Sequence, residues 1–150
     1  MAEESKKVTT TPEHFEIFKA EFLRWVTILG LTDWELFFKH TNPPEDSRAY
    51  IGYTTTYRCA TVYLSPIWEN FDEPPTDEQV RKVAFHEACE LLLARLNILA
   101  QDRYLRHGEV TEAIHAVIRV MENVLFPMYR LEKTGEFLYK YHMVTKKGAE

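Results

Sequence analysis

Three side chains that can take part in chemistry, His86, Glu87 and Glu90, lie in an otherwise apolar segment, residues 84–94. On a helix, which turns by about 100° per residue, His86 and Glu90 are one turn apart on the same face and Glu87 lies beside them. A buried carboxylate without a partner costs roughly several kcal/mol. We therefore expect a cation, a basic side chain or water in a cleft to meet these three groups.

A divalent metal ion is one candidate for that partner. A neutral imidazole and a carboxylate at positions i and i+4 can bind the same small cation, and zinc accepts both kinds of ligand. Glu87 would then lie beside the ion and take a proton from bound water, as the glutamate does in the helical H-E-x-x-H motif. Here Glu90 stands where that motif has its second histidine.

A structural explanation is equally compatible with the spacing. In that case the helix borders a cleft or a subunit contact, and its acids form ion pairs with basic side chains from elsewhere. The arginines considered for this role are Arg48, Arg58, Arg103 and Arg119. Spacing alone does not choose between the metal and the ion pairs.

A third ligand for a metal ion is expected from the next predicted helix. Glu112 and His115 are three residues apart and therefore share a face of that helix. Either residue can complete the site if this face turns toward His86. The alternative is a solvated face with salt bridges at helical spacing, and the apolar residues on the opposite side of the helix fit both cases.

The remaining chain predicts an α+β fold that positions these helices. Phe18, Phe22 and their neighbours recur at three- and four-residue steps after the capping pair Thr11-Pro12, which predicts an N-terminal helix that stops at Gly30. Alternating patterns predict a small three-stranded antiparallel or mixed sheet, followed by two packed helices. The predicted strands begin near Asp33 and cover residues 48–54 and 58–64, and the predicted helices cover about 76–99 and 109–126.

Other features of the sequence set limits on partners and location. A net charge of −5 gives no reason to expect nucleic-acid binding, and no apolar run is long enough to span a membrane. The two cysteines fit a reducing environment, so we expect a cytoplasmic protein. Residues 1–10 are predicted to form a polar tail and 128–150 a C-terminal arm, in which Phe137, Tyr139, Tyr141 and Met143 alternate.

The chain resembles zincins, and more narrowly the small phage- and prophage-encoded metallopeptidases related to the SprT-like group. The resemblance runs from about Thr11 to Pro127 and includes L-G-L-T-D-W-E-L, R-C-A-T-V-Y-L-S, H-E-A-C-E-L-L-L and T-E-A-I-H-A-V-I-R-V-M-E-N-V-L-F. It implies a zincin-like domain over residues 11–127, in which His86 is a metal ligand and Glu87 the general base. The second histidine of the motif is Glu90 here, and a glutamate from the next helix corresponds to Glu112.

The resemblance implies a metal-dependent hydrolase of the peptidase type. Its metal ligands would be His86, Glu90 and Glu112, with His115 as a fourth ligand or a transition-state donor. Zinc is the expected metal. A carboxylate in place of the second imidazole makes the bound metal a weaker Lewis acid. Such a ligand set also suits manganese or iron better than an imidazole-rich set does. The expected partner is a peptide or protein, which would pair by its backbone with the edge of the 58–64 strand. If the protein is phage-encoded, its expected location is the host cytoplasm.

Two other functions remain compatible with the sequence. The first is a non-catalytic phage-type protein-binding module on a zincin-like scaffold, which the glutamate in place of the second histidine would suit. The second is a carboxylate-bridged di-iron centre built from Glu87-x-x-Glu90 and Glu112-x-x-His115. A di-iron centre of that kind needs four long helices, and the alternating segments between residues 34 and 64 argue against it.

Overall fold

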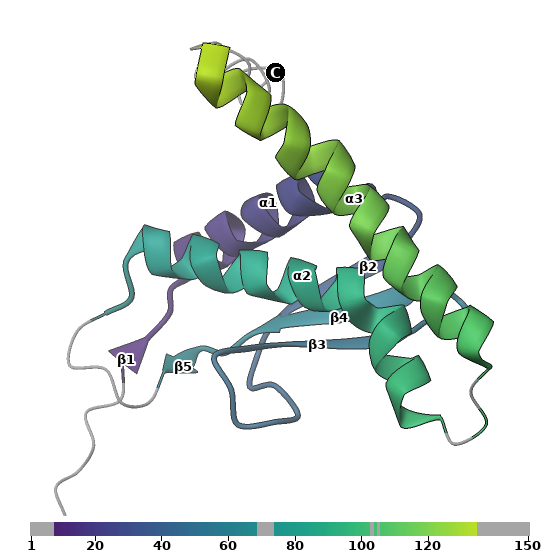
Figure 1. Ribbon diagram of the computed structural model, residues 1–150. Helices are drawn as coiled ribbons and strands as arrows, with labels where there is room; N and C mark the ends of the chain where they lie inside the picture. The colour runs from purple at the N-terminus through teal and green to yellow at the C-terminus, as the bar shows by residue number, and fades with distance from the viewer. Residues whose placement is uncertain (1–7, 69–73, 103, 105, 135–150) are drawn as a thin grey trace, which may run out of the picture. The chain divides into compact units, whose positions relative to one another are not determined.

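The predicted α+β fold is confirmed by a computed structural model, which describes residues 8–68, 74–102, 104 and 106–134 (Figure 1). An N-terminal helix is followed by a small mixed sheet of three strands and then by two helices. The chain divides into two compact units between residues 105 and 106, and the last helix belongs to the second unit. In chain order the elements are β1 (Val8–Thr9), α1 (Pro12–Ile28), β2 (Glu35–His40), β3 (Ala49–Thr54), β4 (Cys59–Leu64), β5 (Ile67–Trp68), α2 (Asp77–Gln101) and α3 (His107–Thr134).

The three-stranded sheet has the order β2-β4-β3. β3 and β4 form an antiparallel hairpin, in which Ile51 lies opposite Val62. β2 pairs with the other side of β4 in the parallel direction, so the sheet is mixed. Because β4 is the central strand, its two edges are already hydrogen-bonded, and the prediction that a peptide pairs along residues 58–64 is wrong. Among the described strands of this sheet, β2 and β3 have the open edges.

The core lies between the sheet and the helices α1 and α2, which cover one face of it (Figure 1). In β4 the side chains of Ala60, Val62 and Leu64 are buried, and those between them are half-buried, as the alternation predicts. Phe22 of α1 is fully buried and its ring meets Phe38 of β2 edge-on, with centroids 5.6 Å apart. The aromatic stripe of the first helix is therefore part of the core, not a ligand cleft.

A buried carboxylate joins α1 to α2. Glu21 accepts a hydrogen bond from the indole Nε1 of Trp25 at 2.9 Å and one from Nη1 of Arg81 on α2 at 3.0 Å. The Trp25 ring also packs on Phe85 of α2, with centroids 4.5 Å apart. Because the Glu21 side chain is only 8% exposed, these partners satisfy a charge that water cannot reach easily. The contacts fix how α2 lies against α1.

Both helices of the first unit begin at capping boxes. Thr11 accepts from the backbone N–H of His14, whose Nδ1 accepts from the backbone of Thr11. Thr76 and Gln79 make the same reciprocal pair at the start of α2, as the sequence predicts. His14 is therefore a capping residue, and each box satisfies backbone donors that the first helical turn leaves without partners.

A Thr76→Ala substitution is expected to lower the free energy of unfolding by about 1 kcal/mol, because it removes the side-chain cap of α2. Urea denaturation of the parent and the variant measures this loss. Thr27→Ala is the matched control. Thr27 lies within α1, and its hydroxyl donates a hydrogen bond to the carbonyl of Leu23 in the same helix, so it caps no helix end. Alanine favours a helix interior, so that variant should be as stable as the parent or slightly more stable. Equal losses in both variants would contradict the prediction.

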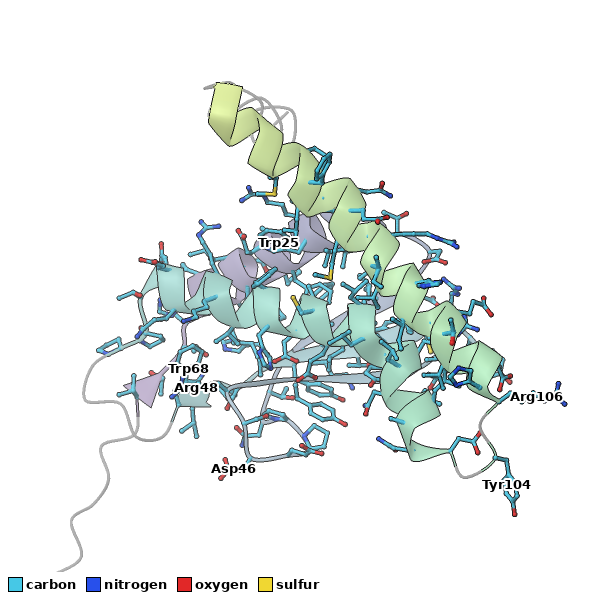
Figure 2. The ribbon with its side chains drawn as sticks, viewed as in Figure 1. Trp25, Asp46, Arg48, Trp68, Tyr104 and Arg106 are labelled. Atoms are coloured by element: carbon cyan, nitrogen blue, oxygen red, sulfur yellow. The ribbon has the colours of Figure 1, made fainter. Side chains whose placement is uncertain are left out.

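The segment predicted as a polar tail contributes two residues to a small second sheet. β1 pairs with β5 in the antiparallel direction, and Val8 and Trp68 are both buried. Thr10 continues this attachment, because its hydroxyl donates to the backbone carbonyl of Ser65 at 2.8 Å. At the same end of the molecule, the guanidinium of Arg48 lies over the Trp68 ring, 5.6 Å from its centroid (Figure 2).

The second unit contains α3, which is longer than predicted. The sequence predicts that this helix ends before Pro127, but the helix begins at His107 and continues through the proline to Thr134. Proline removes one backbone hydrogen bond, to the carbonyl of Asn123, and a long helix can tolerate that loss. The predicted alternation from Phe137 to Met143 lies outside the described residues. No helix in the described ranges combines the length and the apolar character that crossing a membrane requires.

Candidate functional site

α2 places the three polar side chains on two different sides of the helix. Glu87 belongs to the stripe that packs into the core, whereas the first unit leaves His86 and Glu90 exposed. The predicted burial of all three groups is therefore correct only for Glu87. The buried stripe consists of Val80, Ala84, Glu87, Ala88, Leu91 and Ala94.

His86 and Glu90 form a pair on the exposed side of α2. The imidazole Nε2 lies 3.1 Å from Oε1 of Glu90, so it can donate a hydrogen bond to the carboxylate. Two ligand atoms of a tetrahedral zinc ion are about 3.4 Å apart, because each lies about 2.1 Å from the metal. The side chains are 69% and 49% exposed, so both atoms are accessible to a cation. The spacing of this pair fits two neighbouring ligands of one ion.

Glu87 is a buried carboxyl group with an unsatisfied oxygen. The residue is 4% exposed, and its Oε2 has no hydrogen-bond partner in the structure. Burial, assisted by repulsion from the Glu90 carboxylate, raises the pKa of Glu87 from 4.5 to about 8. In the protein without a cation, Glu87 therefore carries a proton at neutral pH. The contribution from Glu90 also means that the two carboxyl groups lie within electrostatic range.

The arginine explanation finds no support among the described residues. No described lysine or arginine forms a salt bridge with Glu87 or Glu90. Arg58 instead pairs with Asp33, which lies just before β2. Of the other three arginines, Arg48 lies over Trp68, Arg119 belongs to the second unit, and Arg103 lies outside the described residues.

Glu112 and His115 lie one turn apart on α3, on one face of that helix, as their spacing predicts. They belong to the second unit, whereas His86, Glu87 and Glu90 belong to the first. Within the described ranges, no three histidine, cysteine, aspartate or glutamate side chains are grouped so that they can hold a metal ion. The first unit thus brings together two candidate ligands, His86 and Glu90, beside the buried Glu87.

A groove that the sequence analysis did not predict begins at Glu90. It has a volume of about 530 Å³ and runs between α2 and β3, the open-edge strand of the sheet. Its lining residues are Tyr53, Glu90, Leu93, Leu96, Asn97 and Ala100. The sequence feature that points to this groove is Asn97, a polar residue between two apolar ones. Its side-chain amide donates a hydrogen bond to the hydroxyl of Tyr53 at 2.7 Å. The groove gives the polar pair a neighbouring site for a larger ligand.

No protein-family model, curated protein or solved structure matches this chain. Its function is therefore inferred from the residues of this site and from their geometry.

Proposed function

We propose that this protein is a metal-dependent hydrolase of the peptidase type, on a zincin-like scaffold. The observation that carries the proposal is the arrangement on α2. Nε2 of His86 and Oε1 of Glu90 lie 3.1 Å apart on an accessible surface, and the next residue after His86 on α2 is the buried Glu87 with its unsatisfied oxygen. An imidazole, a carboxylate and an adjacent carboxyl group are the parts that metal-assisted hydrolysis needs on a helix.

His86 and Glu90 would hold the ion, and zinc, manganese or iron suits this donor set. A cation binds Nε2 of His86 only when the ring hydrogen is on Nδ1, so metal binding would replace the hydrogen bond between His86 and Glu90. Glu112 and His115 stay the further ligands that the sequence predicts. A divalent cation bound there would polarise the scissile carbonyl and make a bound water molecule more acidic.

Glu87 would act as the general base. A carboxyl group transfers protons best when its pKa lies near the working pH, and burial raises the pKa of Glu87 to about 8. In the resting protein the proton on Glu87 prevents a second negative charge next to the Glu90 carboxylate. A nearby cation favours the ionised carboxylate, so Glu87 becomes able to accept a proton when the metal is present.

The substrate we propose is an extended peptide that adds to the open edge of β3. This strand contacts α2, and Tyr53 of β3 lines the same groove as Glu90. A peptide paired with β3 through main-chain hydrogen bonds would therefore pass close to the His86–Glu90 pair. β3 replaces the 58–64 strand, which is central in the sheet, as the element that receives the peptide.

Metal binding to purified protein tests the proposal. We expect stoichiometric zinc or manganese after loading, and His86→Ala and Glu90→Gln should each weaken its affinity by at least about tenfold. Competition with a chromophoric chelator measures the affinity, and Glu78→Gln, an exposed glutamate in the first turn of α2, is the matched control. Glu87→Gln should keep the metal and lose peptide hydrolysis. An absence of bound metal, or equal affinity in all variants, would overturn the metal site.

A second candidate function is a non-catalytic peptide-binding module. The observation that favours it is that the described residues of the first unit bring only two candidate ligands together, while the groove and the edge of β3 need no metal to bind a peptide. In that case Glu87→Gln leaves binding of the partner unchanged, and no cleavage occurs in the parent protein either.

A further inference from the structure

The groove between β3 and α2 has the size and the lining of a site for an apolar side chain. Its volume of about 530 Å³ is within the range of about 300–1,000 Å³ that is typical of ligand sites. Leu93, Leu96 and Ala100 supply apolar surface, and Leu93 is 44% exposed. Covering the exposed Leu93 side chain with a ligand removes apolar surface from water, which favours binding.

The groove contains one fixed polar group. The amide Nδ2 of Asn97 donates to the hydroxyl oxygen of Tyr53 at 2.7 Å, so the Tyr53 proton remains able to donate to a ligand. The Tyr53 ring is also held edge-on by Trp34, with centroids 6.4 Å apart. This pair gives the groove one oriented donor in mostly apolar surroundings, which is the usual way in which such sites orient a ligand.

The charge of the groove limits its ligand. Glu90 is the charged residue in the lining, and it stands at the end that adjoins His86. A carboxylate or phosphate on the ligand would therefore meet repulsion, whereas an uncharged apolar side chain would not. Tyr53 of β3 lines the other side of the groove, and β3 pairs with β4 alone among the described strands. An extended peptide is the ligand that uses both features, because it pairs by its backbone and inserts a side chain.

We propose that this groove is the specificity site for the peptide, and that it selects one large apolar side chain such as leucine or phenylalanine. The inference rests on the peptide ligand of the proposed function, but it does not require the metal or the chemistry. Alternate side chains of a peptide paired with β3 point to the same face. One of them enters the groove between Leu93 and Tyr53, and residues two positions away lie outside it.

Binding of fluorescein-labelled hexapeptides to the metal-free protein tests the inference. The peptides are alanine-based, with leucine, phenylalanine, serine or aspartate at one central position, and a chelator is present throughout. Fluorescence anisotropy is expected to show affinity for leucine or phenylalanine at least about tenfold above that for aspartate. Leu93→Lys should abolish this preference, and Ala100→Phe should do so by filling the groove without adding charge.

Leu23→Lys is the matched control, because Leu23 is an equally exposed leucine, 43% exposed, on α1. It should bind every peptide within about twofold of the parent. Equal affinity for all four peptides, or equal losses in Leu93→Lys and Leu23→Lys, would overturn the groove as the specificity site. These outcomes are independent of hydrolysis, since they are read without metal. Selective binding without any metal-dependent cleavage would leave the inference standing and refute the enzyme.

Discussion

A Glu87→Gln substitution is expected to remove a large pH dependence from the stability of the metal-free protein. The folded protein holds the Glu87 carboxyl in protonated form up to about pH 8, whereas in the unfolded chain it ionises near 4.5. Between these values the folded state binds a proton that the unfolded state has released, so stability falls as the pH rises from about 4.5 to about 8. Each tenfold change in proton affinity is worth about 1.4 kcal/mol, so the total is on the order of several kcal/mol.

Urea denaturation at several pH values, with a chelator present, measures this effect. Parent and variant should have similar free energies of unfolding near pH 5, and the variant should be more stable by several kcal/mol at pH 9. The difference between the two curves removes the titration of other groups, such as His40, whose pKa burial lowers. Glu16→Gln, on the exposed side of α1, should follow the parent within about 0.5 kcal/mol. Parallel curves for the parent and Glu87→Gln would show that Glu87 is not protonated in the folded state.

A Phe22→Ala substitution is expected to lower the free energy of unfolding by about 3–5 kcal/mol. Phe22 is fully buried, and its ring joins α1 to the sheet through Phe38 and to the neighbouring ring of Phe18. Alanine leaves a cavity where three aromatic rings meet, and the backbone of a helix that is pinned to α2 cannot easily close it. Since small domains have total stabilities of about 5–15 kcal/mol, this loss is a large part of the whole.

Leu23→Ala is the matched control for this prediction. Leu23 is the next residue along α1, but 43% of it is exposed, so its loss should cost about 0.5 kcal/mol. The transitions can be compared in urea at one pH, with equal slopes as evidence that both variants unfold in the same way. If both variants lost the same stability, Phe22 would not be the core contact that the structure describes.

Local patterns predicted the elements of the fold well. The alternation around Val62 assigned Ala60, Val62 and Leu64 to one face of β4, which is the buried face, and the Thr76–Gln79 capping box placed the start of α2. Each of these features depends on residues a few positions apart, so the sequence contains the whole signal. The parallel pairing of β2 with β4 depends instead on segments about 25 residues apart, and short-range periodicity does not record which strand becomes central.

The sequence did not predict how the candidate residues lie on α2. His86, Glu87 and Glu90 are neighbours on a helix that is apolar on nearly every side, so periodicity did not show which stripe packs into the core. In the folded protein the small residues Ala84 and Ala88 lie in the buried stripe of α2. Glu87 lies in the same stripe, so its side chain is buried as well. The groove was missed because it combines Tyr53 with a stretch of α2 that lies some 40 residues later in the chain.

The open edge of β3 has a consequence for the behaviour of the protein in concentrated solution. The strand sequence A-Y-I-G-Y-T, residues 49–54, contains no proline and no charged side chain. Natural sheets often use such residues on outer strands to discourage neighbouring molecules from joining edge to edge. A strand left available for a peptide is equally available to the same strand of a second molecule, so crowding favours self-association through β3, and a bound peptide should suppress it.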